Sequence, residues 1–96
     1  MSTVIVVFQA KPGRGGALSA WLLSKHPGLA AHQGFIDISI FRDARDPDRI
    51  VEVEHWTESA AHRNMVESVD AQGGWDELGE LVVEEPHTMY LEQIES

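Results

Sequence analysis

The sequence predicts a small α+β fold of the ferredoxin-like βαββαβ type, with a four-stranded antiparallel sheet and its helices on one face. Two observations lead to this prediction. Runs of β-branched, aromatic or alternating apolar residues mark four strands, and apolar residues at helical spacing mark two helices between them. A chain of 96 residues has room for one domain, so residues 1–96 are expected to form a single unit.

The first strand is predicted over residues 3–10, which read TVIVVFQA and are rich in β-branched side chains. The KPGRGG segment that follows breaks this strand. A helix is predicted over 17–25, where apolar side chains that include Trp21 recur at helical spacing. The Pro27-Gly28 pair is expected to end this helix.

Two alternating runs, over residues 34–42 and 49–56, predict an antiparallel hairpin. Thr57 is a suitable N-cap for a second helix. The apolar stripe of that helix has four members: His62, Met65, Val66 and Val69. A short helical turn and a last strand over roughly 87–94 complete the predicted order of elements.

Pairing the two runs of the hairpin about their turn sets Phe35 opposite Trp56, Asp37 opposite Glu54 and Ser39 opposite Glu52. Side chains alternate between the two faces of a strand, so these six groups are expected to share one face. The hairpin therefore predicts an acidic patch framed by aromatic rings. The alternative is that the glutamates of the second run are ordinary solvated strand residues.

Two helices cannot cover both faces of a sheet, and both faces of this predicted sheet carry large apolar side chains. A second copy of the chain, packed sheet to sheet, is the simplest cover for the remaining face. We therefore expect a homodimer in which two open sheets close into a barrel.

Composition excludes several classes of site and partner. The chain has no cysteine, so disulfides, thiolate nucleophiles and zinc–thiolate sites are excluded. Its net charge of −9 argues against nucleic acid and anionic membranes as partners. No signal peptide is evident, so a cytoplasmic location is expected. The histidines show no metal-ligand spacing, and no metal or other cofactor is expected.

Several segments resemble the antibiotic biosynthesis monooxygenase family. They are KPG at 11–13, GF at 34–35, FRDARDPDR at 41–49 and EHWTES at 54–59. The resemblance implies a dimeric α+β barrel with an apolar pocket between helices and sheet in each subunit. In characterised members it implies oxygenation of polycyclic phenols or quinols without metal or flavin. Haem-degrading enzymes and isomerases share this domain, so the fold alone does not settle the function.

The chain departs from the family pattern at two places. Nine residues after Trp56 the family often has a histidine, and this chain has Met65 instead. A histidine stands at His62, where the family usually has an apolar residue. The first strand also lacks the asparagine that haem-degrading members carry, which argues against haem binding.

Three residues are predicted to carry the chemistry. His62 is the expected general base, oriented by Asp37 or Glu54. Trp56 is the expected pocket wall and hydrogen-bond donor, and Tyr90 is expected to donate its hydroxyl to a substrate oxygen. Further substrate-binding positions are Phe35, Asp37, Glu54, Met65 and Trp21. The alternative for His62 is a core histidine with a satisfied ring nitrogen, and for Trp56 and Tyr90 it is core packing.

The leading functional hypothesis is a cofactor-independent monooxygenase that acts with dioxygen on a small phenolic or quinol-type polycyclic aromatic molecule, in secondary metabolism. Two alternatives remain open at this point. One is a non-oxidative isomerase or cyclase of the same fold, which would use the same base without oxygen. The other is a small-molecule-binding module without catalysis.

Overall fold

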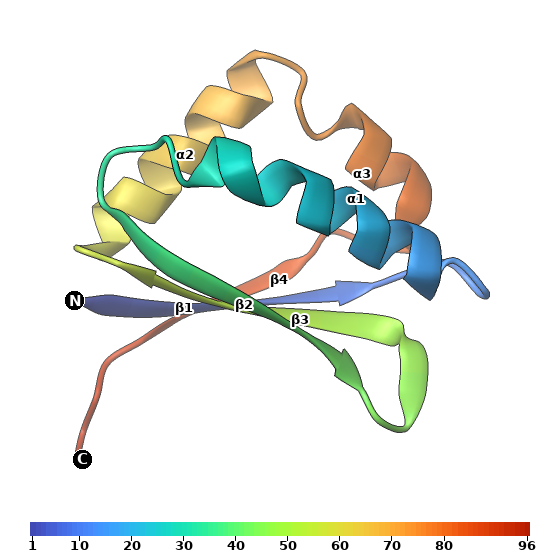
Figure 1. Cartoon of the computed structure of the whole chain (residues 1–96), viewed down its shortest axis with the longest axis horizontal. Coiled ribbons are helices and arrows are strands. Elements are labelled where there is room, and N and C mark those ends of the chain that lie inside the picture. Colours follow the sequence, from blue (N-terminus) through green and yellow to red (C-terminus); the bar gives the residue numbers. More distant parts are fainter.

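The computed structural model describes residues 1–96 and has a ferredoxin-like α+β fold, as the sequence predicts (Figure 1). Its elements in chain order are β1 (Ser2–Gln9), α1 (Gly15–Leu29), β2 (Phe35–Asp43), β3 (Asp46–Trp56), α2 (Ser59–Ala71), α3 (Asp76–Leu81) and β4 (His87–Leu91). No helix is long and apolar enough to cross a membrane.

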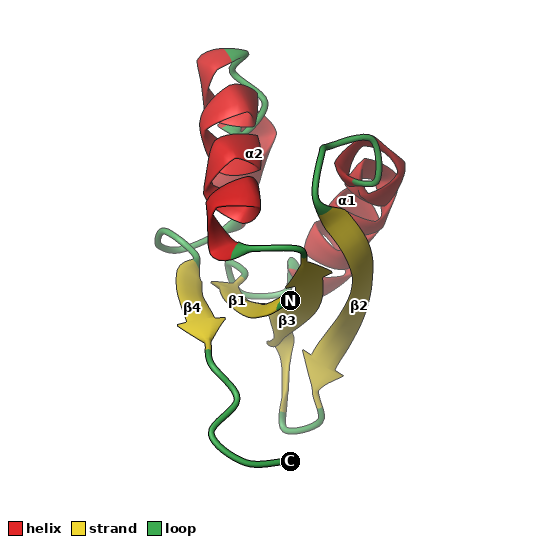
Figure 2. Cartoon of the chain, turned by 90° about the vertical axis from the view of Figure 1, so that its left-hand side faces the viewer, coloured by secondary structure: helices red, strands yellow, loops and turns green.

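The four strands form one sheet in the order β2-β3-β1-β4, with every neighbouring pair antiparallel. Figure 2 shows α1 and α2 on the same side of this sheet and standing apart from each other. We call the side toward the helices the covered face; it carries Val4, Val6, Phe8, Glu52 and Glu54. The other side, which carries Ile5, Val7, Val51 and Val53, is the open face.

The register of the hairpin differs in part from the predicted one. Phe35 pairs with Trp56 as predicted, but a β-bulge between Phe35 and Asp37 adds one residue to β2. Asp37 therefore pairs with His55 on the open face, and its predicted position opposite Glu54 is wrong. A shift of one residue moves a side chain to the opposite face, so Asp37 leaves the predicted acidic patch.

Two element boundaries also differ from the prediction. Helix α1 continues through Pro27 to Leu29 instead of ending there. Proline removes only one backbone donor from a helix, and the amide of Ala30 still bonds to the carbonyl of His26 and closes the last turn. Strand β4 ends at Leu91, because its pairing with β1 stops at Thr3.

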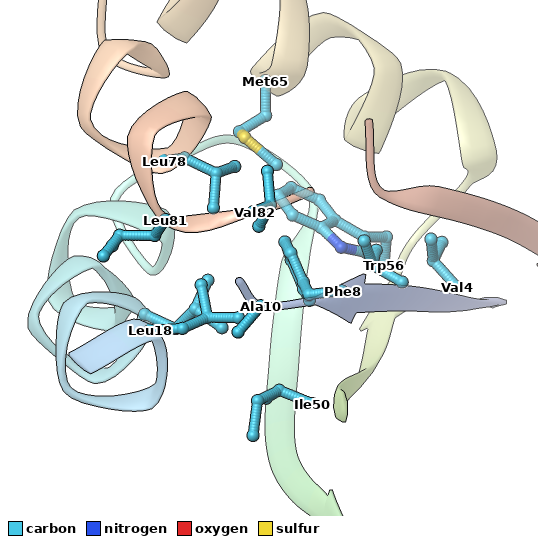
Figure 3. Packing of buried hydrophobic residues seen from close by; sticks show 12 residues of the cluster. Val4, Phe8, Ala10, Leu18, Ile50, Trp56, Met65, Leu78, Leu81 and Val82 are labelled. Atoms are coloured by element: carbon cyan, nitrogen blue, oxygen red, sulfur yellow. The ribbon is translucent and has the colours of Figure 1, made fainter. Parts of the chain in front are cut away.

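The hydrophobic core fills the space between the covered face and the helices. Figure 3 shows Phe8 and Ala10 of the β1 segment close to side chains that the helices direct toward the sheet, and Val4 beside Trp56. The helical members of the cluster are Leu18 and Leu22 from α1, Met65 from α2, and Leu78 and Leu81 from α3. Trp56 is fully buried in the same cluster.

The turn before β2 requires a glycine. Gly34 has a φ of +90°, and a Cβ at this position would lie 2.6 Å from the Cβ of Ala61 in α2. Its carbonyl accepts a hydrogen bond from the amide of Thr57 at 2.8 Å. Because no other residue allows this close approach, Gly34 fixes the start of β2 against the start of α2.

Candidate functional site

A cleft of about 850 Å³ lies between the covered face and the helices. Its floor is formed by Val6, Phe8, Glu52 and Glu54 from the sheet. One wall comes from α1 and includes Trp21, Leu22 and Leu29, and the other comes from α2 and α3 and includes His62, Met65, Val66, Val69 and Leu78. This volume and largely apolar lining are typical of small-molecule sites, which range from roughly 300 to 1,000 Å³.

The floor of the cleft holds two buried glutamates from β3. Glu52 and Glu54 are only 4% and 2% exposed, and both lie on the covered face because they are two residues apart on one strand. Their partners across β1 are Val6 and Val4, which offer no polar group in return. The default interpretation of these glutamates as solvated strand residues is therefore wrong.

Burial of the two carboxyl groups changes their proton affinity. Removal from water disfavours the charged form and raises the pKa of both Glu52 and Glu54 to about 7. The two carboxyl groups lie on the same face of β3, and the charge of Glu52 further raises the pKa of Glu54. Near neutral pH the pair therefore retains about one proton and can take up a second.

Each glutamate has a further partner of its own. The Trp56 indole N–H donates to Oε1 of Glu54 at 3.0 Å, and this bond favours the ionised form of that carboxyl. Nε2 of His26, in α1, lies 2.9 Å from Oε2 of Glu52. Burial lowers the pKa of His26, and the negative charge of Glu54 opposes this effect in part.

His62 lies on the cleft wall beside the glutamate pair. It is 3% exposed, and its Nδ1 hydrogen-bonds to the Tyr90 hydroxyl at 2.8 Å. Its Nε2 is 3.8 Å from Oε1 of Glu54, too far for a direct hydrogen bond. Burial, with a smaller contribution from the Arg63 charge, lowers the pKa of His62 to about 4. The imidazole is therefore neutral at neutral pH.

Contacts between aromatic rings hold Trp56, His62 and Tyr90 in place. The Trp56 ring meets Phe35 edge-on with ring centres 5.4 Å apart, and it meets His62 in the same manner at 5.6 Å. The Tyr90 ring contacts His62 at 5.4 Å on the other side. The Arg63 guanidinium lies over the Tyr90 ring at 5.4 Å. These edge-to-face contacts leave the imidazole little freedom to rotate.

The predicted site residues divide into three groups. Glu54, Trp56, His62 and Tyr90 come together, with Glu54 and His62 on the cleft surface. Met65 and Trp21 line the cleft, whereas Phe35 supports Trp56 from outside the lining. Asp37 lies on the open face, where it bonds to Nδ1 of His55. It therefore cannot orient His62, and the predicted contact between them is wrong.

Sequence reasoning placed Glu52 on the same face as Glu54 through the alternation of β3, but it assigned Glu52 no role in the site. It missed His26. His26 had no signal, because its contact with Glu52 joins positions 26 residues apart. No cluster of three or more histidine, aspartate or glutamate side chains is arranged to hold a metal ion.

Comparison with known proteins identifies one family, by both sequence and structure. The model of the family described as antibiotic biosynthesis monooxygenase matches residues 1–74. A protein from Bordetella bronchiseptica, named as a candidate antibiotic biosynthesis monooxygenase, superposes with a TM-score of 0.86 at 21% identity, covering 97% of this chain and 96% of its own. A search of curated protein sequences found no match.

Two further solved structures have the same fold. SnoaB, a cofactor-independent oxygenase from Streptomyces nogalater, superposes with a TM-score of 0.80 at 14% identity, covering 99% of this chain and 94% of its own. A protein from Mycobacterium tuberculosis gives 0.80 at 20% identity, covering 99% and 96%. At these identities, the structural matches support the fold and not a shared substrate.

Proposed function

Because the chain belongs to the antibiotic biosynthesis monooxygenase family, we propose that it is a cofactor-independent monooxygenase of a phenolic or quinol-type polycyclic aromatic molecule in secondary metabolism. The observation that carries this proposal is the buried pair Glu52–Glu54 on the floor of a largely apolar cleft. A carboxylate with a pKa near 7 is a competent general base at neutral pH.

The glutamate pair is a better base than His62. A group with a pKa of about 4 gives up a proton too readily to hold one taken from a substrate at neutral pH. The carboxyl pair, with its pKa raised to about 7, holds such a proton. In this proposal Glu54 is the base, and Trp56 orients it through the indole N–H.

The reaction needs only the substrate, dioxygen and this base. Glu54 removes a proton from a phenol O–H or an activated C–H, and the bonding electrons stay on the aromatic anion. The anion transfers one electron to dioxygen, and the resulting radical and superoxide combine into a carbon–oxygen bond. The peroxide takes a proton back from the glutamate pair. Loss of water then leaves a carbonyl, so one CH₂ and one O₂ become one C=O and one H₂O.

Neutral His62 has a separate role in this scheme. When Nδ1 accepts a hydrogen bond from the Tyr90 hydroxyl, the other ring nitrogen of neutral His62 carries the N–H, on the side of the ring toward Glu54. That N–H donates to the substrate oxygen on which negative charge develops. Trp21 and Met65 supply apolar walls that keep water from the anion.

We also propose that the protein works as a homodimer through the open face. No helix covers this face, and it carries Ile5, Val7, Val51 and Val53 from the two central strands. Phe41 and Leu91 add apolar area that is largely exposed in the single chain. A continuous apolar surface of this kind is typical of an interface.

The test is turnover of anthrone, a model substrate with an activated CH₂. Under air we expect anthraquinone and one equivalent of consumed dioxygen, and under nitrogen we expect no quinone. Glu54→Gln should lower turnover by roughly 10²–10⁴-fold, the range typical of a lost general base. Glu77→Gln, on the exposed side of α3, is the matched control and should keep full turnover. Equal turnover in both variants would contradict the assignment of the base.

A non-oxidative isomerase is the second candidate, and the shared proton of Glu52 and Glu54 favours it. One carboxylate can accept a proton from one carbon while its protonated neighbour delivers another proton elsewhere. This function predicts a product of unchanged mass that forms equally under air and nitrogen. Binding of anthrone without any turnover would instead favour a small-molecule-binding module.

A further inference from the structure

We propose that Glu52 and His26 form a proton route from the cleft floor to solvent that is separate from the opening used by the substrate. This inference rests on the proposed function, because it concerns the proton that the glutamate pair accepts. His26 acts through Glu52 and does not touch the substrate.

The contacts and the exposed fractions of these side chains define a path from the cleft floor to solvent. Nε2 of His26 lies 2.9 Å from Oε2 of Glu52, and Glu52 lies beside Glu54 on the covered face of β3. The His26 side chain is 18% exposed, whereas the Glu52 side chain is 5% exposed. His26 therefore connects a buried carboxyl group to bulk water through one imidazole ring.

The route does not run through the cleft. Lys25 and Leu29 of α1 line the cleft, but His26, on the turn between them, does not. An aromatic ligand that fills the cleft covers Glu54 and excludes water from it. It leaves the outer side of His26 in contact with solvent.

In the proposed reaction the peroxide takes back the proton that the pair accepts, so the route matters when the aromatic anion forms before dioxygen arrives. The pair can then return to its one-proton state while the cleft is still occupied. After the substrate C–H bond breaks, its electrons stay on the ligand and the proton joins the pair, which then holds two protons. Glu52 passes one proton to Nε2 of His26, and His26 releases the proton on Nδ1 to water. Burial lowers the pKa of His26, so the imidazolium that forms in this step releases its proton readily to water.

The experiment follows two signals after anthrone is mixed with the protein under nitrogen. Absorbance of the anthrone anion reports proton removal by the pair, and phenol red in weakly buffered solution at pH 7 reports proton release to solvent. In the wild type we expect both signals together. In His26→Ala we expect the anion signal at first, with proton release slowed by roughly 10²-fold, the low end for a lost proton-transfer group.

Two further variants separate proton transfer from a structural role. His26→Gln can keep a hydrogen bond to Glu52 but carries no titratable nitrogen, so it should be as slow as His26→Ala. Added imidazole should restore proton release in His26→Ala, where the ring has left a space at the surface, and not in His26→Gln. His87→Ala, which removes an exposed imidazole on β4, is the control and should match the wild type. Normal proton release in both His26 variants would overturn the proposal.

A titration separates failure of this inference from failure of the proposed function. If the wild type forms no anthrone anion, the proposed base is wrong, and the ring nitrogens of His26 are then followed by NMR against pH. A proton route requires His26 and the carboxyl pair to titrate together, so Glu52→Gln should change the His26 curve. An unchanged curve in Glu52→Gln would overturn the route.

Discussion

Strand β3 carries different chemistry on its two faces. Toward the helices it presents Glu52, Glu54 and Trp56, all deeply buried, and toward the uncovered side it presents Val51, Val53 and His55, all partly exposed. A sheet with one solvated face normally turns its apolar side chains inward and its charged side chains outward. In β3 this pattern is inverted for four residues in succession, from Val51 to Glu54.

This inverted pattern gives the two faces of β3 different energetic consequences. Burial of two carboxyl groups without a cation costs stability, and the proton-transfer role that we propose for them offsets this cost with a benefit to function. Partly exposed valines in the centre of a sheet gain further stability when another surface covers them. The comparison therefore links the covered face to a reaction and the open face to a second copy of the chain, as we propose.

The largest effect is expected from Val53→Glu on the open face. Val53 pairs with Ile5 and Ser39 at the centre of this face, and two-fold symmetry would bury the new charge twice in one interface. We expect sedimentation at micromolar concentration to give twice the 10.7 kDa chain mass for the wild type and the single chain mass for the variant.

Leu23→Glu is the control for this prediction. Leu23 is an exposed apolar residue on α1, away from the open face, and its replacement should leave the dimer intact. A wild type that sediments as a monomer would refute the dimer. A Val53→Glu variant that remains a dimer would show that the interface lies on another surface of the chain.

The second effect concerns His62 on the covered face. His62→Phe keeps an aromatic ring beside Trp56 but removes the N–H toward the cleft and the bond to Tyr90. If His62 donates to the substrate oxygen, turnover of anthrone should fall by roughly 10²–10³-fold, as for other lost oxyanion donors. The melting temperature measured on the same sample should change little. Full turnover with a lowered melting temperature would instead identify a structural core histidine.

The third effect is the pH dependence of stability, in which the two buried groups act in opposite directions. The folded-state pKa of Glu52 and Glu54 is raised from 4.5 to about 7, so the native state binds more protons than the unfolded chain in this window. Their contribution to the free energy of unfolding is therefore lost as the pH rises from 4.5 to 7. The folded-state pKa of His62 is lowered from 6.5 to about 4, so stability falls as the pH drops through that window.

Glu54→Gln isolates the contribution of the carboxyl pair. It should raise the melting temperature at pH 8 by roughly 5–10 °C, and the gain should vanish near pH 4.5. The loss of stability at low pH that His62 causes should remain in this variant. Calorimetry from pH 4 to 8 would measure how the melting temperature changes with pH in both proteins. A variant that melts below the wild type at pH 8 would show that burial of the Glu54 carboxyl does not cost stability.

The smallest effect is expected from Asp37→Asn on the open face. Asp37 lies on the edge strand β2, its side chain is 64% exposed, and it bonds to Nδ1 of His55. Exposed ion pairs of this kind contribute about 0–1 kcal/mol. Urea unfolding at pH 6 should therefore differ from the wild type by less than about 1 kcal/mol. A larger loss would show that the partner subunit reaches to the edge of the sheet.

Periodicity predicted the elements that depend on local pattern. Alternation gave both strands of the hairpin and the Phe35–Trp56 pair, and helical spacing brought His62 and Met65 to the inner side of α2. These predictions succeeded because side-chain direction repeats within one element.

Features that depend on distant contacts could not be predicted in the same way. Gly34 precedes the bulge, but nothing in residues 35–37 marks where the register shifts, and this shift alone moves Asp37 to the open face. Alternation divides β3 into an acidic and an apolar face but does not say which one the helices cover. The burial of Glu52 and its contact with His26 follow only from how α1 crosses back over β3.

The cleft between α1 and α2 has a consequence for how the substrate class can be found. A ligand seated there would bridge two helices and bind only the folded chain, so it would raise the free energy of unfolding by RT ln(1 + [L]/Kd). At a hundredfold excess over Kd this is about 2.7 kcal/mol, and each kcal/mol corresponds to roughly 4–8 °C in a domain of this size. Melting curves recorded across a panel of hydroxylated aromatic compounds would therefore rank ligands by affinity, even for compounds that bind without being turned over.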